Sequence, residues 1–381
     1  MDLVHEIENK LASKFKRAHS VLTGSGTTAI YLLLKALELK SDDAVLMPGI
    51  CCFAPAYAVK YAGLNLDFCD ISQKDGCLTP KLLELALRNN NRIKVVIGVH
   101  LYGNVLELDD IIKICKERGI VFVEDACQAY GSYYKDEPCG SFGDFSVISF
   151  GHTKILDAGG GGALLTENTE IANSIRKMLK TKKKYDSTLA SSLSKKHREE
   201  YYAIQRAAMN DPQKRFLFGT IWKRYKDLFI HNINHNVIPK LNFLLENEGK
   251  IIGHRIKLSR LYKKLLNNCS KVAFVESDYR TIPWRFNCLI YDINVEALCD
   301  SIRKNGFDIS TWYPNLANIY IQDNDRKLKN ADIFEKLIVN MWVDETKDET
   351  YVEQLCAIVK KNLSDQKEKI KQATEFWLMK N

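Results

Sequence analysis

The sequence predicts an α/β protein built on a parallel sheet, followed by a second and smaller lobe. From about residue 20 to residue 170, short apolar segments rich in Val, Ile and Phe alternate with segments whose apolar residues recur at helical spacing. Strands that alternate with helices form βαβ units, in which helices cover both faces of a parallel sheet. A chain of 381 residues is also too long for one small core, which favours two unequal lobes.

The individual elements follow from the same patterns. The predicted strands of the first lobe are residues 43–49, 64–71, 93–103, 119–127, 145–151 and 161–167. Residues 79–90 and 107–119 have the 3.6-residue spacing of amphipathic helices, and Gly119 is the expected residue just beyond the second of them. These elements define the first lobe and the order in which its strands occur.

The second half of the chain has a different composition. From about residue 176 to residue 236 it is basic and aromatic, and we expect a mainly helical insertion. Residues 281–293 and 336–345 are predicted strands, and a final helix is predicted from residue 351. We therefore predict a large domain over residues 1–245 and a small C-terminal domain over residues 246–381.

Composition excludes several classes of protein. The hydrophobic fraction of 46% and the charged fraction of 27% are those of an ordinary globular protein, and no apolar run reaches membrane-spanning length. The N-terminal residues have mixed charge and no apolar core, unlike a secretory signal. The eleven cysteines show no zinc-ligand spacing, so we expect no metal and reduced thiols in a cytoplasmic protein. A net charge of +8 is too diffuse to indicate nucleic-acid binding.

Polar residues follow three of the predicted strands. They are His100, then Glu124 with Asp125, and then the segment from Ser149 to Lys154. In parallel α/β sheets, ligands bind beyond the carboxyl ends of the strands. We therefore expect a histidine, a carboxylate and an amine at one edge of the sheet.

A glycine-rich turn near residue 25 opens a predicted helix. The backbone N–H groups of a first helical turn, together with the hydroxyls of Ser25, Thr27 and Thr28, form a suitable phosphate site. The segment matches neither a Walker loop nor a GxGxxG motif, and hydroxyl capping of a helix without any ligand is the commoner outcome.

A strand-end carboxylate, a strand-end lysine and a phosphate cradle together fit a pyridoxal phosphate site. The cofactor needs an amine for covalent attachment and a carboxylate that keeps its pyridine nitrogen protonated. It also needs a helix N-terminus for its phosphate.

Five segments in order resemble the DegT/DnrJ/StrS family of sugar aminotransferases: GSGTTAI, HLYGN, EDACQAYGS, GSFGDFSVISFGHTK and GGGGALLT. The resemblance is close over residues 20–170 and looser beyond them. It implies a fold-type I enzyme whose large lobe has a mostly parallel seven-stranded sheet flanked by helices, with a smaller α+β C-terminal lobe. It further implies pyridoxal 5′-phosphate as cofactor and a homodimer with the active site at the subunit interface.

The resemblance also implies roles for individual residues. Lys154 would attach the cofactor and move a proton between it and the substrate carbon, and Asp125 would pair with the pyridine nitrogen. Gln128 would contact the oxygen on the cofactor ring. The expected phosphate ligands carry hydroxyl groups: Thr27, Thr28 and Ser149.

Two further positions are less typical of the family. Many members carry an aromatic residue that stacks on the cofactor ring where this chain has Cys52, which would make a soft contact instead. His100 either faces the cofactor or packs the end of its strand. The family's loop to the partner subunit is not recognisable, although Asn232, Asn234 and Asn236 lie near the expected place.

The expected activity is transfer of an amino group, from L-glutamate, to a keto sugar linked to a nucleotide, in the biosynthesis of amino sugars and surface polysaccharides. A sugar dehydratase of the same family is one alternative, because dehydratases carry histidine in place of the lysine. Here His152 lies near, but Lys154 holds the matching position. A cofactor-binding regulatory protein without catalysis is a second alternative, suggested by the divergent residues 176–250.

The basic stretch over residues 214–233 has apolar residues at helical spacing. A basic amphipathic helix could lie on a membrane surface. The simpler interpretation is a helix that covers the large lobe or a dimer interface.

Overall fold

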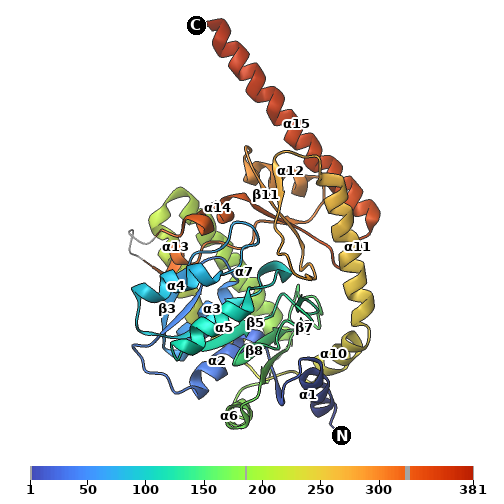
Figure 1. Ribbon diagram of the computed structural model, residues 1–381. Coiled ribbons are helices and arrows are strands. Elements are labelled where there is room, and N and C mark those ends of the chain that lie inside the picture. Colours follow the sequence, from blue (N-terminus) through green and yellow to red (C-terminus); the bar gives the residue numbers. More distant parts are fainter. Residues whose placement is uncertain (1, 185–186, 322–326, 381) are drawn as a thin grey trace.

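A seven-stranded sheet forms the centre of the large lobe in the computed structural model, which describes residues 2–184, 187–321 and 327–380 (Figure 1). Its strand order is β1-β9-β8-β5-β4-β2-β3. The strands are β1 His19–Thr23, β2 Ala44–Pro48, β3 Asn65–Cys69, β4 Ile93–Val99, β5 Val121–Asp125, β8 Phe145–Ser149 and β9 Gly162–Thr166. Strands β3, β2, β4, β5 and β8 pair in parallel, whereas β9 is antiparallel to both of its neighbours. The mostly parallel seven-stranded sheet is confirmed.

Helices flank this sheet, as the alternating pattern predicted (Figure 1). They are α1 Leu3–Lys14, α2 Gly26–Ala36, α3 Phe53–Ala62, α4 Pro80–Asn89, α5 Leu108–Glu117 and α6 Thr169–Leu179. A 3₁₀ turn, η1 Leu101–Gly103, follows β4, and a short hairpin joins β6 Tyr133–Tyr134 to β7 Glu137–Pro138. Gly119 has φ +62°, which suits its predicted place after α5. All six predicted strands are present, and β1 is a seventh that the pattern did not predict.

The insertion after α6 differs from the prediction. Helix α7 spans Ser187–Asn210, but the stretch over residues 214–233 is not one amphipathic helix. It is divided among η2 Pro212–Leu217, α8 Phe218–Ile221, η3 Trp222–Arg224 and α9 Lys226–Phe229. Its apolar residues Phe218, Ile221 and Tyr225 are buried in the core of the large lobe. These three side chains, which would have met a membrane, are therefore turned inward.

The smaller lobe contains a four-stranded antiparallel sheet of order β10-β11-β13-β12. Its strands are β10 Val272–Phe274, β11 Phe286–Ile290, β12 Ile309–Ser310 and β13 Ile338–Met341. The helices of the second half are α10 Val237–Glu246, α11 Glu248–Leu266, α12 Val295–Lys304, α13 Ala317–Tyr320, α14 Lys329–Leu337 and α15 Glu349–Lys380. Helix α11 runs along one side, from the region of α1 and α10 to the smaller sheet (Figure 1). The domain boundary at residues 245 and 246 stays a prediction, and it falls at the end of α10.

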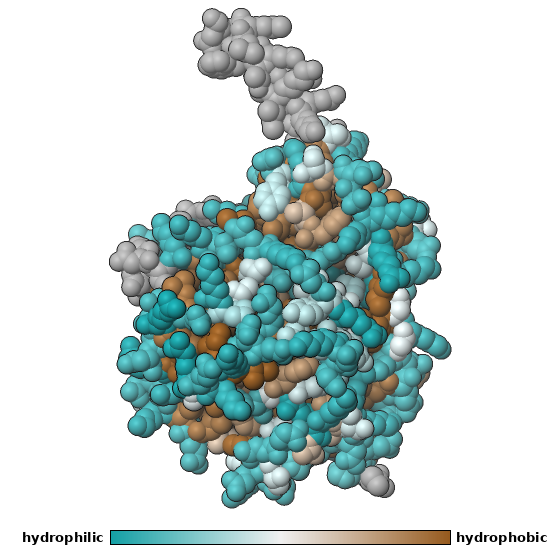
Figure 2. All heavy atoms as spheres, in the orientation of Figure 1, coloured by the Kyte–Doolittle hydropathy of each residue, from teal (hydrophilic) through white to brown (hydrophobic). Residues whose placement is uncertain are grey.

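Among the described helices, none combines the length and the apolar character needed to cross a bilayer. The face drawn in Figure 2 is largely hydrophilic, with apolar patches between charged side chains. Most of the apolar side chains of the large lobe belong instead to one continuous core around the sheet.

Candidate active site

The carboxyl ends of three neighbouring parallel strands bring the predicted residues to one edge of the sheet. Asp125 ends β5, where it pairs in register with Val99 of β4 and Val147 of β8. Its side chain is 5% exposed, and its Oδ1 accepts a hydrogen bond from the Cys127 amide at 3.0 Å. Because Ser149 ends β8, the turn that carries Lys154 leaves the sheet beside Asp125. The topology therefore places the carboxylate at the end of one strand and the amine in the turn after the adjacent strand.

A backbone hydrogen bond and two contacts from the small lobe hold the turn that carries Lys154. The Lys154 amide donates to the Gly151 carbonyl at 3.2 Å, and Thr153 adopts a positive φ of 65°. The Trp284 indole donates to the Thr153 carbonyl at 2.6 Å, and Arg255 Nη2 donates to the Lys154 carbonyl at 3.4 Å. Sequence analysis did not predict either of these small-lobe contacts, because no local pattern marks them.

Cys52 lies within the electrostatic reach of both Lys154 and Asp125. Burial raises the pKa of the Cys52 thiol, the Lys154 ammonium opposes this rise, and the Asp125 carboxylate adds to it. The same two charges act on the pKa of Cys127, which burial also raises. Both thiols thus stay protonated near neutral pH, so each offers a soft, polarizable surface rather than a nucleophile. Cys127 was not predicted as a site residue.

The first turn of α2 is closely packed against the end of β8. Ser25 Oγ caps the Thr28 amide at 3.0 Å. A Cβ atom at Gly26 would lie 3.3 Å from Ser149 Cβ, so the backbone here closely approaches that side chain. Thr27 is 6% exposed, and among the described residues its hydroxyl has no hydrogen-bond partner. Ser149 therefore packs against the residue that precedes Thr27 in the first turn of this helix.

Thr28 is engaged differently from Thr27. Its Oγ1 lies 3.0 Å from the Phe229 carbonyl, to which it donates, and accepts from the His231 amide at 3.2 Å. The segment after α9 thus binds the Thr28 side chain within a fully buried environment. Ser149 thus lies against the first turn of α2, whereas the Thr28 hydroxyl is hydrogen-bonded to the chain's own backbone.

Gln128 and His100 occupy the interior beside this edge. Gln128 is 3% exposed, and its Oε1 accepts from the Tyr102 amide at 3.1 Å. His100 is fully buried: its Nδ1 accepts from the Leu106 amide at 3.2 Å, and its Nε2 lies 2.9 Å from Glu124 Oε1. With both ring nitrogens used inside the protein, the geometry favours the packing role for His100.

Glu124, His100 and Cys139 place possible metal-binding atoms within 4.8 Å of one another. The carboxylate of Glu124 is already surrounded by donors, with the Gly140, Phe142 and Gly143 amides at 2.5, 2.9 and 3.1 Å. Burial opposes its charge, but the His100 contact and these amides lower the pKa of Glu124 overall. The cluster is satisfied as a buried hydrogen-bond network.

Comparison with known proteins identifies the family. Residues 2–198, just over half of the chain, match the family model described as the DegT/DnrJ/EryC1/StrS aminotransferase family. The chain belongs to this family. It is 31% identical over 165 residues to GDP-perosamine synthase of Escherichia coli O157:H7, covering 43% of this chain and 45% of the relative. It is 34% identical over 171 residues to UDP-N-acetyl-3-dehydro-alpha-D-glucosamine 3-aminotransferase of Acidithiobacillus ferrooxidans, covering 45% of this chain and 46% of the relative.

The likeness in fold extends over nearly the whole chain, although these curated relatives match it over less than half their length. The aminotransferase TlmJ from Streptoalloteichus hindustanus has a TM-score of 0.79 at 18% identity, covering 96% of this chain and 92% of that one. Helicobacter pylori PseC, an aminotransferase in pseudaminic acid biosynthesis, has a TM-score of 0.76 at 17% identity, with the same coverage. At these identities the likeness shows the fold alone, and it confirms the fold-type I architecture.

Pyridoxal 5′-phosphate is the cofactor of this family, and the residues at this edge fit it. The unpartnered Thr27 hydroxyl and Ser149 lie at a helix N-terminus, where a phosphate is favoured. Asp125 and Lys154 supply the carboxylate and the amine that the group requires. His152, by contrast, points to solvent, with its side chain 77% exposed and its Nδ1 3.8 Å from Asp157.

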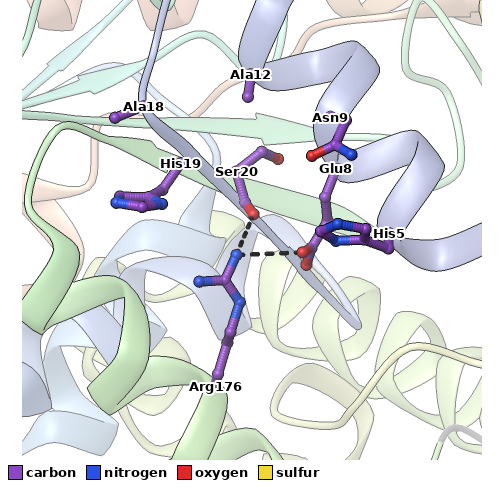
Figure 3. Close-up of a pocket in the computed structure, with 8 residues that line it drawn as sticks. All are labelled: His5, Glu8, Asn9, Ala12, Ala18, His19, Ser20 and Arg176. Carbon is purple, nitrogen blue, oxygen red and sulfur yellow. Dashed lines mark hydrogen bonds and ion pairs between the residues drawn. The ribbon is translucent and has the colours of Figure 1, made fainter.

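A separate hollow of about 240 Å³ lies at the opposite edge of the sheet (Figure 3). Residues of α1, the start of β1 and α6 line it, and Arg176 Nη2 bridges Glu8 Oε2 at 3.2 Å and the Ser20 carbonyl at 2.9 Å. Because β1 runs parallel to β8, its start lies away from the carboxyl ends of the strands. The hollow contains none of the predicted site residues.

Proposed function

We propose that this protein is an aminotransferase that uses pyridoxal 5′-phosphate to move an amino group from L-glutamate to a keto sugar. The observation that carries the proposal is that Asp125 ends β5 beside β8, which ends at Ser149 and leads into the turn of Lys154, with the first turn of α2 packed against Ser149. Family membership supports the reaction class. The names of the two relatives, which refer to GDP- and UDP-linked sugars, support a nucleotide-linked acceptor in amino-sugar and polysaccharide biosynthesis.

Each residue has a distinct task in this proposal. When bound, the cofactor supplies an electron sink that stabilises negative charge on the substrate carbon. Asp125 holds a proton at the pyridine nitrogen, and burial to 5% exposure strengthens that charge interaction. Lys154 attaches the cofactor and moves a proton to and from the substrate carbon. Thr27 and Ser149 bind the phosphate, and Gln128 contacts the oxygen on the ring.

Cys52 takes the place of a stacking aromatic residue in this proposal. Its half-buried, protonated thiol would offer the cofactor ring a soft apolar group. Phe53 belongs instead to an aromatic cluster, with its ring centroid 4.9 Å from that of Tyr57 and 5.3 Å from that of His197. The insertion, through His197, thus packs against Phe53, the residue that follows Cys52.

The dehydratase alternative is less well supported. It requires histidine at the position of the attaching lysine, and Lys154 holds that position while His152 faces solvent. The regulatory alternative leaves the buried Asp125 and the nearby Lys154 without a joint task. Incubation with a keto sugar nucleotide separates the dehydratase, which removes water without transferring an amine from glutamate. Conversion of the bound cofactor to its amine form by glutamate separates the regulatory alternative, which has no catalysis.

The Lys154→Arg variant is the direct test, because it keeps the charge but removes an amine able to attach the cofactor. We expect it to lose the visible absorbance of attached cofactor and all turnover with glutamate and keto sugar nucleotides. Lys180→Arg, a change at an exposed lysine at the end of α6, is the matched control and should behave like the native protein. Full turnover in Lys154→Arg contradicts the proposal.

We further propose a cytoplasmic homodimer with the active site at the subunit interface, as the family resemblance implies. All eleven cysteines are free, which supports a reducing compartment. Light scattering on the purified protein measures the mass of the particle, and a monomer at micromolar concentration contradicts the dimer.

A further inference from the structure

Arg285 is a buried arginine held in a fixed position just before β11. Its side chain lies between two indole rings, with Cζ 4.2 Å from the centroid of Trp284 and 3.6 Å from that of Trp342. Its Nη1 donates to Ser310 Oγ at 2.7 Å, and Ser310 in turn donates to Asn340 Oδ1 at 2.9 Å. The residue is 6% exposed. These contacts orient the guanidinium before any ligand arrives.

The charge of Arg285 has no acidic partner within the described chain. The carboxylate of Asp344 acts on it but does not come within the 4.0 Å of an ion pair, and that carboxylate already accepts from the Thr346 amide at 3.0 Å. Burial lowers the pKa of Arg285 to about 10, so the side chain remains charged at neutral pH. A buried charge is normally paired or bound to a ligand.

A second buried arginine, Arg255, differs from Arg285 because it has an acidic partner. Arg255 is 3% exposed and lies near enough to lower the pKa of Arg285, but it has Glu345 at 3.6 Å. Among the described hydrogen bonds, Arg285 uses only Nη1, so its Nε and Nη2 remain to donate. A guanidinium that presents two N–H groups in one plane matches a carboxylate. The unpaired charge therefore favours an oxyanion of a substrate.

Arg285 also lies next to the turn that carries Lys154. Its neighbour Trp284 donates to the Thr153 carbonyl at 2.6 Å, and the Trp284 carbonyl accepts from Arg255 Nη1 at 3.0 Å. On the other side, the Trp284 ring stacks at 5.9 Å on Tyr102, whose amide binds Gln128. Through Trp284, Arg285 is thus next to the contacts that position Lys154 and Gln128.

We propose that Arg285 binds the carboxylate of the amino donor. This inference rests on the proposed aminotransferase function. The α-carboxylate of an amino acid is bonded to the carbon that carries the amine, so it must lie close to Lys154 when that amine reacts. A phosphate of a nucleotide-linked acceptor is separated from the reacting carbon by part of a sugar ring. The donor carboxylate, rather than the acceptor phosphate, is therefore the oxyanion expected to bind Arg285 beside the turn that carries Lys154.

The two half-reactions of a transaminase can be measured separately, which distinguishes a donor carboxylate from an acceptor phosphate as the ligand of Arg285. In Arg285→Met, whose unbranched side chain can still lie between the two indoles, we expect kcat/KM for glutamate to fall by about 100-fold. The fall should come mainly through KM, and the half-reaction of the amine form with the keto sugar nucleotide should be unchanged. Arg285→Lys should recover part of the loss. Arg260→Met, at an exposed arginine of α11, is the control and should change neither half-reaction.

Binding of glutarate, a dicarboxylate with no amine, gives a readout that does not depend on turnover. Because Trp284 and Trp342 enclose Arg285, we expect glutarate to change the tryptophan fluorescence of the native protein with cofactor, but not that of Arg285→Met. Near-ultraviolet circular dichroism checks that the variant is folded. If it is not, Arg285→Lys must show weakened glutarate binding.

The outcomes are distinguishable. An unchanged donor half-reaction and unchanged glutarate binding in folded Arg285→Met overturn the inference. So does a loss confined to the acceptor half-reaction, which would assign Arg285 to a phosphate, or an equal loss in both. If the native protein performs neither half-reaction, the proposed function fails, and glutarate binding still decides whether Arg285 holds a carboxylate.

Discussion

The carbonyl oxygen of Lys154 accepts a hydrogen bond from Arg255 Nη2, with 3.4 Å between the two atoms. Arg255 belongs to α11, and 101 residues separate the two along the chain. The same guanidinium donates from Nη1 to the Trp284 carbonyl at 3.0 Å. A helix of the second half of the chain therefore fixes the backbone of the residue that is proposed to attach the cofactor.

Arg255→Met should loosen the Lys154 turn. The change leaves the buried Trp284 carbonyl and the partly buried Lys154 carbonyl without this donor, and we expect the free energy of unfolding to fall by about 2–3 kcal/mol. Cofactor affinity should fall as well, because Lys154 is no longer held in place. Urea unfolding and titration with cofactor measure the two effects. Unchanged cofactor affinity in a destabilised variant would show that Arg255 supports only the fold.

Asp125→Asn should separate cofactor binding from catalysis. The amide has nearly the same shape and can still accept from the Cys127 amide, but it cannot hold the pyridine nitrogen in its charged state. We expect the cofactor to bind and turnover to fall by at least ~100-fold, since a charge acting in a buried site is removed. Asp136→Asn, at an exposed aspartate, is the control for loss of a negative charge. Turnover within a few-fold of native in Asp125→Asn would contradict the assigned role.

The pair Thr27→Val and Thr28→Val tests which hydroxyl faces the phosphate. Thr27 has no partner among the described residues, so its loss should weaken cofactor binding by about 10-fold with little change in stability. Thr28→Val removes the acceptor of the His231 amide and one of the two hydroxyl donors to the Phe229 carbonyl, the other being Ser25 Oγ at 2.8 Å, and should lower the free energy of unfolding by about 1–3 kcal/mol. Cofactor titration and urea unfolding of both variants provide the comparison. The reverse pattern would mean that the Thr28 hydroxyl is the phosphate ligand.

Sequence patterns predicted the helices and strands that a local spacing of apolar residues reveals. Asp125 and Lys154 each follow a buried apolar strand, so parallel topology alone predicts that they meet. Strand β1 was missed because only two of its five residues, Val21 and Leu22, are apolar. The prediction of one amphipathic helix over residues 214–233 was wrong, because consecutive short helical turns produce nearly the same spacing of apolar residues as one helix.

The parts of the site that the sequence did not predict come from contacts between distant segments. Arg255 and Arg285 look like ordinary surface cations in the sequence, and only contacts with residues distant along the chain, Lys154 for Arg255 and Ser310 and Trp342 for Arg285, reveal their buried positions. His100 was ambiguous for a related reason. Its role depends on Glu124 and Leu106, and a strand-end histidine has no local pattern that distinguishes a cofactor contact from a buried hydrogen bond.

A buried histidine should make the protein less stable in mild acid. His197 of the insertion is 5% exposed, and burial lowers its pKa to about 4, below the 6.5 of an unhindered imidazole. Its Nε2 lies 3.4 Å from the Tyr57 hydroxyl, with which the neutral ring can form a hydrogen bond. Because the unfolded chain binds the proton more readily, this residue favours unfolding as the pH falls from about 6.5 towards 4.

We expect the free energy of unfolding to fall over that interval by up to about 3 kcal/mol on account of His197. Urea unfolding of the native protein and of His197→Phe, measured at pH 7 and at pH 4.5, isolates the effect. The phenylalanine ring can pack among the same aromatic residues but cannot take up a proton, so the variant should lose less stability on acidification. His231, whose pKa burial also lowers, keeps part of the acid sensitivity in both proteins. An equal loss of stability in both proteins would show that His197 is not buried in its neutral form.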